Sequence, residues 1–260
     1  MRTEDGLRDA GAFPRDAEAF GALADAVAAG RLAPGAPVTD RWSPALPLVT
    51  GARIVCIGLN YAEHAKEGGR DIPDYPGLFL RVDTSLVANG EAVPMPAISD
   101  RMDYEAELLV VIGRGGRAIP EETALEHVLG YGVFNDISIR DYQRKGAQWT
   151  PGKNFDRTGV TGEEIVTRDE LPPGADGLRI RSILNGAVMQ DANTSMMIFP
   201  VARAIAIISS FMTLKPGDLI ATGTPSGVGY ARNPPVWMKA GDEIAVEIER
   251  VGRISSRIAA

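Results

Sequence analysis

The sequence has little of the chemistry that holds a disulfide or a soft metal. Among its 260 residues there is one cysteine, Cys56, and there are two histidines, His64 and His127. A single cysteine excludes an internal disulfide and fits a reducing compartment. One cysteine and two histidines cannot build the four-ligand cage of a structural zinc site. Any bound metal must therefore rest largely on oxygen ligands.

Long apolar runs and an excess of basic residues are also missing. No stretch approaches the roughly 20 apolar residues of a membrane span, and the first residues carry acids where a secretory signal has a short apolar core. We therefore expect a cytoplasmic protein with no membrane role. A net charge of −7 and a pI near 5.0 argue against a nucleic-acid partner. An anionic small substrate would need locally clustered cations.

The hydrophobic residues, 45% of the chain, follow one pattern near the N-terminus and another over the rest of the chain. Residues 15–30 place Ala, Leu and Phe at helical spacing before a glycine, and "RLAPGAPV" then breaks the chain. We therefore expect a small N-terminal segment over residues 1–50. Over residues 51–260, short apolar runs are separated by Gly, Pro, Asn and Asp, which predicts strands and one catalytic domain.

The order of these runs predicts the fold class. They read "RIVCIGL", "ELLVVIG", "YGVFND", "LRIRSILNG", "DLIATGTP" and "DEIAVEIERVG", and they do not alternate regularly with helices. This favours an α+β, predominantly β roll of mixed or antiparallel sheets over a doubly wound parallel fold. Helical windows interrupt the strands at residues 120–129 and 199–213. The second is apolar nearly all round, so we expect it to pack against the sheets.

Two acids, one residue apart, stand at the start of one apolar run. In "RMDYEAELLVVIG", Glu105 and Glu107 point to the same face of an extended chain, with backbones roughly 6.5–7 Å apart. The run that follows, residues 108–112, does not alternate, which indicates a strand buried on both sides. Two like charges at the entrance to the interior need a partner that neutralises them.

A third acid, Asp136, ends the apolar run in "GYGVFNDISIRDYQ", and Arg140 and Gln143 follow it closely. Together with Glu105 and Glu107, Asp136 offers an oxygen ligand set that suits a hard divalent ion such as Mg²⁺ or Mn²⁺. Spacing alone leaves an alternative open, in which the two glutamates lie on a solvated strand face and the aspartate caps a turn.

Three further residues are candidates for chemistry. His64 precedes Glu67 by one helical turn in "IGLNYAEHAKEGG", so the carboxylate can tune the imidazole as a general base, or the two can form a weak surface pair. Lys153 lies between turn residues in "TPGKNFD". Thr224 lies among glycines in "ATGTPSGVG", where a hydroxyl and an amide can bind a carboxylate. None of these motifs is specific by itself.

Taken together, "IGLNYAEHAKEGG", "DYEAELLVVIG", "FNDISIRDYQ", "GKNFD", "PGDLIATGTPSGVG" and "KAGDEIAVEIERVG" resemble the fumarylacetoacetate hydrolase family in order and spacing, over about residues 50–258. The resemblance implies a mixed β-sandwich roll of the type of that family's C-terminal domain, usually a homodimer. It also implies a divalent metal, Mg²⁺ or Mn²⁺, held by Glu105, Glu107 and Asp136.

The resemblance assigns roles to the remaining candidates as well. His64 and Glu67 match a catalytic pair on a lid that orders when ligand binds. The positions that contact the substrate's carboxylate and oxo oxygens match four residues of this chain: Lys153, Arg140, Gln143 and Thr224. Among these, Lys153 is expected to act in catalysis by stabilising an oxyanion, and the other three are expected to bind the substrate.

The expected function is that of a metal-dependent hydrolase that cleaves a C–C bond of an acylpyruvate or other diketo acid, like fumarylpyruvate or fumarylacetoacetate, through a metal-stabilised enolate. In this scheme His64 and Glu67 activate a water molecule. The same 2-oxo acid chemistry also serves an oxaloacetate-type decarboxylase or a hydroxymuconate-type isomerase, and both stay open. A binder of organic acids without turnover is disfavoured, because a binder needs no water-activating pair.

Two departures from the family pattern put the identity of the substrate in doubt. Arg81-Val82 stands where the family commonly has Lys-Pro, and "FDRTGVTGEEIV" replaces a proline-rich turn. We expect both departures to lie near loops that shape the pocket and to leave the metal site intact. Residues 1–50 match nothing that can be assigned to chemistry.

Overall fold

A computed structural model of the protein describes residues 2–3, 6–7, 13–32, 35–37, 46 and 48–260. Within the N-terminal segment, the predicted helix forms as α1 (Ala17–Ala28). The side chain of Asp16 caps it by accepting a hydrogen bond from Ala19 N at 2.8 Å, and Phe20 is one of its buried residues. The division of the chain at residue 50 stays a prediction, because much of the preceding segment lies outside the described residues.

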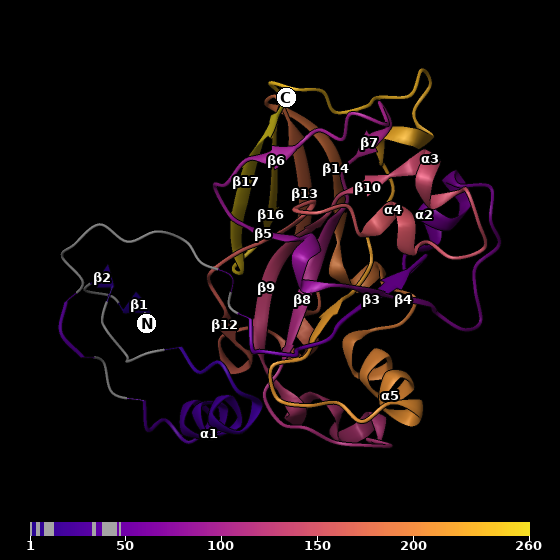
Figure 1. The fold of residues 1–260 in the computed structure, drawn as a ribbon. Helices are drawn as coiled ribbons and strands as arrows, with labels where there is room; N and C mark the ends of the chain where they lie inside the picture. Colours follow the sequence, from indigo (N-terminus) through magenta and orange to yellow (C-terminus); the bar gives the residue numbers. More distant parts are fainter. Residues whose placement is uncertain (1, 4–5, 8–12, 33–34, 38–45, 47) are drawn as a thin grey trace.

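Eight strands form a large mixed sheet (Figure 1). In space they follow the order β4, β3, β15, β8, β9, β11, β5, and β12 pairs with β9. Their bounds are β3 (Ile54–Gly58), β4 (Gly77–Arg81), β5 (Leu86–Ala88), β8 (Ala106–Ile112), β9 (Val128–Asp136), β11 (Gly159–Thr161), β12 (Val166–Thr167) and β15 (Leu219–Ala221). The β3–β15 and β5–β11 pairs are parallel, and the other pairs are antiparallel.

A second sheet of five strands packs against the first. Its order is β14 (Ala187–Asn193), β13 (Arg179–Leu184), β16 (Glu243–Ile248), β17 (Gly252–Ala259) and β6 (Val93–Pro94). Two short pairs complete the strands, β7 (Met102–Asp103) with β10 (Ser138–Ile139) and β1 (Arg2–Thr3) with β2 (Gly6–Leu7). The predicted class, α+β and mostly β with mixed sheets, is confirmed.

The other helices are short. They are α2 (Ala62–Glu67), α3 (Arg140–Gln143), α4 (Thr150–Lys153), α5 (Val201–Phe211) and the 3₁₀ segments η1 (Asp83–Ser85), η2 (Glu121–His127), η3 (Arg168–Glu170), η4 (Pro173–Ala175), η5 (Thr194–Met196) and η6 (Gly229–Ala231). None of the helices in the described part of the chain is long and apolar enough to cross a membrane.

The two helical windows met different outcomes. The window at 199–213 forms α5, whose buried side chains share one core with residues of both large sheets, such as Val110 of β8 and Ile180 of β13, as expected of a helix that packs against the sheets. It also contacts η2 and η4. The window at 120–129 forms the 3₁₀ segment η2. Ala124 is the one residue of η2 that is buried, so little apolar area favours a longer helix there.

The pairing of β8 explains how one unbroken apolar run is buried on both faces. Leu108 and Val110 pack into a core that they share with residues of the second sheet, whereas Leu109 and Val111 pack into another core with Phe20 of α1. Every residue of β8 is buried, as predicted. At one end of the large sheet, α2, α3 and α4 gather around the ends of its strands (Figure 1).

The strands β9 and β12 approach very closely at Gly130. A Cβ at this position would lie 2.3 Å from the carbonyl oxygen of Val166. We expect Gly130→Ala to force the strands apart and to lower the free energy of unfolding by about 1–3 kcal/mol, measured by urea denaturation. Gly146→Ala is the control, because a Cβ there meets nothing within 4 Å. Equal stabilities of the two variants would contradict this reading of the sheet.

Candidate active site

The register of β8 and β9 brings three acids together. Glu107 lies opposite Phe134, and the backbone N–H of Asp136 donates to the carbonyl oxygen of Glu105 at 2.9 Å. Residues two apart on a strand share a face, so the three carboxylates project to the same side. One oxygen of each lies within 4.8 Å of the others, and all three residues are buried. The predicted ligand set is therefore assembled in the interior and not on a solvated strand face.

Basic side chains from three elements surround these acids. Arg140 Nη2 lies 2.7 Å from Glu105 Oε1. The ammonium of Lys153 donates to Glu105 Oε2 at 2.6 Å and to Asp136 Oδ2 at 2.5 Å. The guanidinium of Arg81 contacts the other carboxylate oxygen of Asp136. All three cations are buried, so each ion pair lies in an environment where an unpaired charge is costly.

These cations outweigh burial in setting the charge state of Glu105. Burial raises the pKa of Glu105, but the charges of Lys153 and Arg140 lower it by more than burial raises it, so that the pKa falls to about 2. Burial also lowers the pKa of Lys153, but the charges of Asp136 and Glu105 reverse this effect and raise that pKa above its ordinary value. The pair therefore stays ionised across the physiological pH range.

Glu107 differs from the other two acids, because no basic side chain of the described residues pairs with it. Its Oε2 accepts a hydrogen bond from Gly223 N at 2.9 Å. Burial, and then the charges of Asp136 and Glu105, raise the pKa of Glu107 well above its ordinary value. The cluster thus lacks positive charge next to a buried carboxylate. A set made only of carboxylate oxygens fits a divalent ion such as Mg²⁺ or Mn²⁺.

Arg81 contacts the carboxylates more directly than expected. It is the last residue of β4, beside the connection to η1, and besides Asp136 its guanidinium donates to Ser85 Oγ at 3.2 Å and to Thr158 Oγ1 at 2.8 Å. A departure from the family pattern that was predicted to leave the metal site intact is therefore in direct contact with it. The two partners are 55 residues apart in the chain, and the tertiary fold brings them together.

His64 lies on α2 with its Nδ1 2.7 Å from Glu67 Oε1. The other oxygen of Glu67 accepts a hydrogen bond from Gly227 N at 2.9 Å, which fixes the carboxylate. The His64 side chain is 7% exposed and that of Glu67 is 20% exposed, so the pair is not a weak surface contact. Because Nδ1 faces Glu67, Nε2 is the ring nitrogen left for a ligand.

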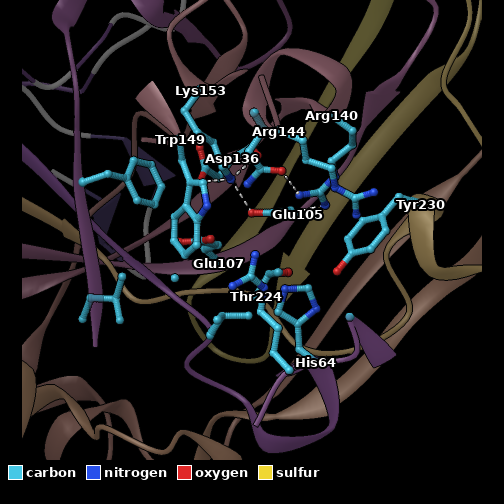
Figure 2. Close-up of a pocket in the computed structure, with 17 residues that line it drawn as sticks. His64, Glu105, Glu107, Asp136, Arg140, Arg144, Trp149, Lys153, Thr224 and Tyr230 are labelled. Atoms are coloured by element: carbon cyan, nitrogen blue, oxygen red, sulfur yellow. Dashed lines mark hydrogen bonds and ion pairs between the residues drawn. The ribbon is translucent and has the colours of Figure 1, made fainter. Parts of the chain in front are cut away.

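One pocket of about 240 Å³ joins these groups (Figure 2). In that view, His64 and Thr224 lie on one side of Glu105, and Arg140 and Lys153 lie on the other. Of the nine predicted site residues, eight line this pocket, and Glu67 lies behind His64. The lining also includes residues that sequence reasoning missed: Ile57, Gly58, Leu59, Gly68, Arg70, Phe79, Arg144, Trp149 and Tyr230.

The three residues predicted to bind substrate are held by protein partners. Arg140 donates from Nε to Asp103 Oδ2 at 2.7 Å and from Nη1 to Gln143 Oε1 at 2.9 Å. Thr224 Oγ1 accepts from Gln190 Nε2 at 2.7 Å, so its own hydroxyl hydrogen remains for a ligand. Gln143 uses its Oε1 to accept the hydrogen bond from Arg140, so the two N–H donors on its Nε2 remain for a ligand.

Sequence reasoning also missed the buried polar residues that position the site. Asp103 accepts from the backbone N–H of Tyr230 at 3.1 Å as well as from Arg140. Gln190, on β14 of the second sheet, donates to Thr224 of the pocket lining. Asn60, just before α2, donates to Thr222 O at 2.7 Å. Their partners are distant in the chain, so no local pattern marks them, although Asn60 does fall inside the quoted segment "IGLNYAEHAKEGG".

Fold and pocket together define a mixed-β protein with an oxygen-ligand site for a divalent metal and a histidine–carboxylate pair beside it. The family model described as "Fumarylacetoacetate (FAA) hydrolase C-terminal" matches residues 53–259. The chain belongs to the fumarylacetoacetate hydrolase family, as its motifs predicted.

Individual relatives carry different activities in their names. "Oxaloacetate tautomerase fahd2, mitochondrial" of Xenopus laevis is 42% identical over 214 residues, which cover 82% of this chain and 67% of that protein. The structure of a protein from Mycobacterium smegmatis provisionally named HpcE is 38% identical, with a TM-score of 0.92, and the match covers 100% of this chain and 95% of that one.

A third comparison bears on the metal. The structure of fumarylpyruvate hydrolase from Pseudomonas aeruginosa, in complex with Mn²⁺ and pyruvate, is 31% identical with a TM-score of 0.73. The match covers 87% of this chain and 97% of that one. The family therefore includes a hydrolase and tautomerases, and at least one member binds a divalent metal.

We expect the buried contact between Arg81 and Asp136 to contribute to stability. We expect Arg81→Met to leave Asp136 without one of its cations and to lower the free energy of unfolding by about 3–5 kcal/mol, measured by urea denaturation in the presence of a chelator. Arg203→Met removes an exposed partner of Glu121 and should lower it by less than about 1 kcal/mol. Similar losses in the two variants would contradict the assigned role of Arg81.

Proposed function

We propose that this protein catalyses the keto–enol tautomerisation of a 2-oxo acid, with oxaloacetate as the substrate to test first. The observation that carries the proposal is the position of His64, which lines the same pocket as the three carboxylates and is oriented by Glu67. A proton-transfer reaction next to a carbonyl needs one such base and a site for the carbonyl oxygen. The name of the Xenopus laevis relative, at 42% identity, supports the choice of reaction.

The proton balance assigns one task to His64. Toward the enol, Nε2 of neutral His64 accepts a proton from the carbon next to the oxo group, the C–H electron pair forms the C=C bond, and the C=O π pair moves to the oxo oxygen. The oxo oxygen takes a proton from solvent water, and the imidazolium releases its proton to solvent. Glu67 accepts a hydrogen bond from Nδ1 and so stabilises the imidazolium. In the reverse direction the imidazolium returns the proton to carbon.

The remaining site residues bind the head of the substrate. Glu105, Glu107 and Asp136 would hold a divalent ion, which when bound supplies positive charge for a developing negative charge on a substrate oxygen. Gln143 and Thr224 offer free donors to the substrate carboxylate, and Arg140 orients Gln143. Lys153 lies at the carboxylates with its ammonium directed into them, and we assign to it the stabilisation of the oxyanion.

His64 and His127 provide a matched pair of variants. We expect His64→Ala to lower the kcat for ketonisation of enol-oxaloacetate by about 10²–10⁴-fold, because the general base is lost, and to leave Mn²⁺ affinity nearly unchanged. His127→Ala should keep full activity, because His127 bonds to Arg114 O away from the pocket. The decay of enol absorbance and a Mn²⁺ titration measure the two effects. Loss of Mn²⁺ binding with intact turnover in His64→Ala would contradict the assignment.

A second candidate function is the hydrolysis of acylpyruvates that the sequence motifs suggest. The likeness to fumarylpyruvate hydrolase, over 97% of that chain, favours it. If His64 activates water, pyruvate should be released from fumarylpyruvate in the presence of Mg²⁺, and a chelator should stop the release. If no pyruvate is released and enol-oxaloacetate decays in a metal-dependent way, the hydrolase is excluded and the tautomerase remains. Pyruvate formed from oxaloacetate would instead indicate the decarboxylase. Binding of a 2-oxo acid without any turnover would indicate a binder.

Homodimer formation and a cytoplasmic location stay proposals for this chain. They follow from the family resemblance and from the composition of the sequence. Size-exclusion chromatography with light scattering would measure the oligomeric state directly.

A further inference from the structure

The pocket carries two arginines that the proposed mechanism does not use. Arg70 and Arg144 both line it, and both residues are exposed. Within the described part of the chain, neither guanidinium forms an ion pair or a hydrogen bond with a protein acceptor. The guanidinium of Arg144 makes a cation–π contact with the ring of Tyr230. Two cationic side chains without an anionic partner therefore face one small pocket in a protein of net charge −7.

The other cations of the pocket already have carboxylate partners. Arg140 pairs with Asp103 and Glu105, and Lys153 pairs with Glu105 and Asp136. The head of a 2-oxo acid has its own partners at the carboxylate cluster, Gln143 and Thr224. Arg70 and Arg144 are thus left for a second anionic group on the same ligand.

Tyr230 holds Arg144 in place. Its ring contacts two guanidinium groups, with the centroid 4.5 Å from Arg140 Cζ and 4.5 Å from Arg144 Cζ. The backbone N–H of Tyr230 is bound to Asp103, which also binds Arg140. Arg144 therefore stacks on a ring whose position the buried ion pairs fix, which reduces the entropy lost when it binds a ligand.

Arg70 is connected to the helix that carries the proposed base. Its backbone N–H donates to Ala65 O at 2.9 Å, and Gly68 N donates to His64 O at 3.2 Å, so the chain turns tightly after α2. Gly68 also lies against the hydroxyl of Tyr230, since a Cβ on Gly68 would be 2.7 Å from that oxygen. An anion held by Arg70 is thus linked through one turn of backbone to His64.

We propose that Arg70 and Arg144 bind the distal carboxylate of a dicarboxylic 2-oxo acid and so determine the specificity of the site. This assignment rests on the proposed function, because it takes the 2-oxo acid head as bound at the carboxylate cluster. Guanidinium groups suit the planar carboxylate through paired N–H donors. Binding energy from this remote group serves to orient the reacting carbon toward His64, so its loss lowers kcat as well as affinity.

The test uses two acids that differ only at the far end. 2-Oxoglutarate carries a carboxylate where 2-oxopentanoate carries a methyl group, and calorimetry in the presence of Mg²⁺ measures the affinity of each. We expect the wild type to prefer 2-oxoglutarate, and Arg70→Gln and Arg144→Gln each to reduce this preference about tenfold. Arg144→Lys should restore part of it. Lys145 follows Arg144 in the chain but does not line the pocket. Lys145→Gln also removes one positive charge, and it should keep the preference for 2-oxoglutarate.

Kinetics with enol-oxaloacetate provide a second readout, in which Arg70→Gln should lower kcat as well as raise KM. If both acids bind and the two arginine variants keep the wild-type preference, the assignment of Arg70 and Arg144 is wrong while the 2-oxo acid site stands. If Lys145→Gln reduces the preference as much as Arg144→Gln, the effect is one of net charge and the assignment is equally wrong. If the wild type binds neither acid, the proposed function fails together with the inference.

Discussion

The balance of charge around three buried carboxylates is the constraint on which the rest of this structure depends. The strand pairing of β8 with β9 places Glu105, Glu107 and Asp136 on one buried face, where unpaired negative charges would be costly. Arg81 at the end of β4, Arg140 at the start of α3 and Lys153 at the end of α4 are brought to them. These ion pairs fix where the edge strand and both short helices lie, and therefore where the pocket is.

The balance of charge is incomplete at Glu107, and this is where a metal ion would bind. Glu107 keeps a raised pKa because burial and its acidic neighbours act without a basic partner among the described residues. A divalent ion would complete the balance, while His64, to which we assign proton transfer, lies on a different element. The proposed metal ligands and the proposed base thus lie on different elements. This separation is compatible with one fold that serves both a hydrolase and tautomerases, the activities named for the relatives.

Local patterns were enough to predict much of the fold and the candidate site, and long-range contacts were not visible to them. Glu105 and Glu107 could be placed on one face because a strand has a period of two, and the motif order connected them to Asp136 and His64. Arg81 and Asp136 are 55 residues apart, and their pairing depends on how the sheet and its flanking segments fold together, so no local pattern revealed it. Gln190 and Asp103 were missed because their partners lie on other elements, with no local spacing to reveal them.

The central claim is that Glu107, which has no basic partner among the described residues, completes a divalent-cation site. Mn²⁺ titration followed by electron paramagnetic resonance tests this claim most directly. A Glu107→Gln variant keeps an oxygen acceptor for Gly223 N and loses the charge. The account predicts one Mn²⁺ per chain in the wild type and strongly weakened binding in Glu107→Gln. Equal binding in the two proteins would contradict it, because the ion would then be held elsewhere.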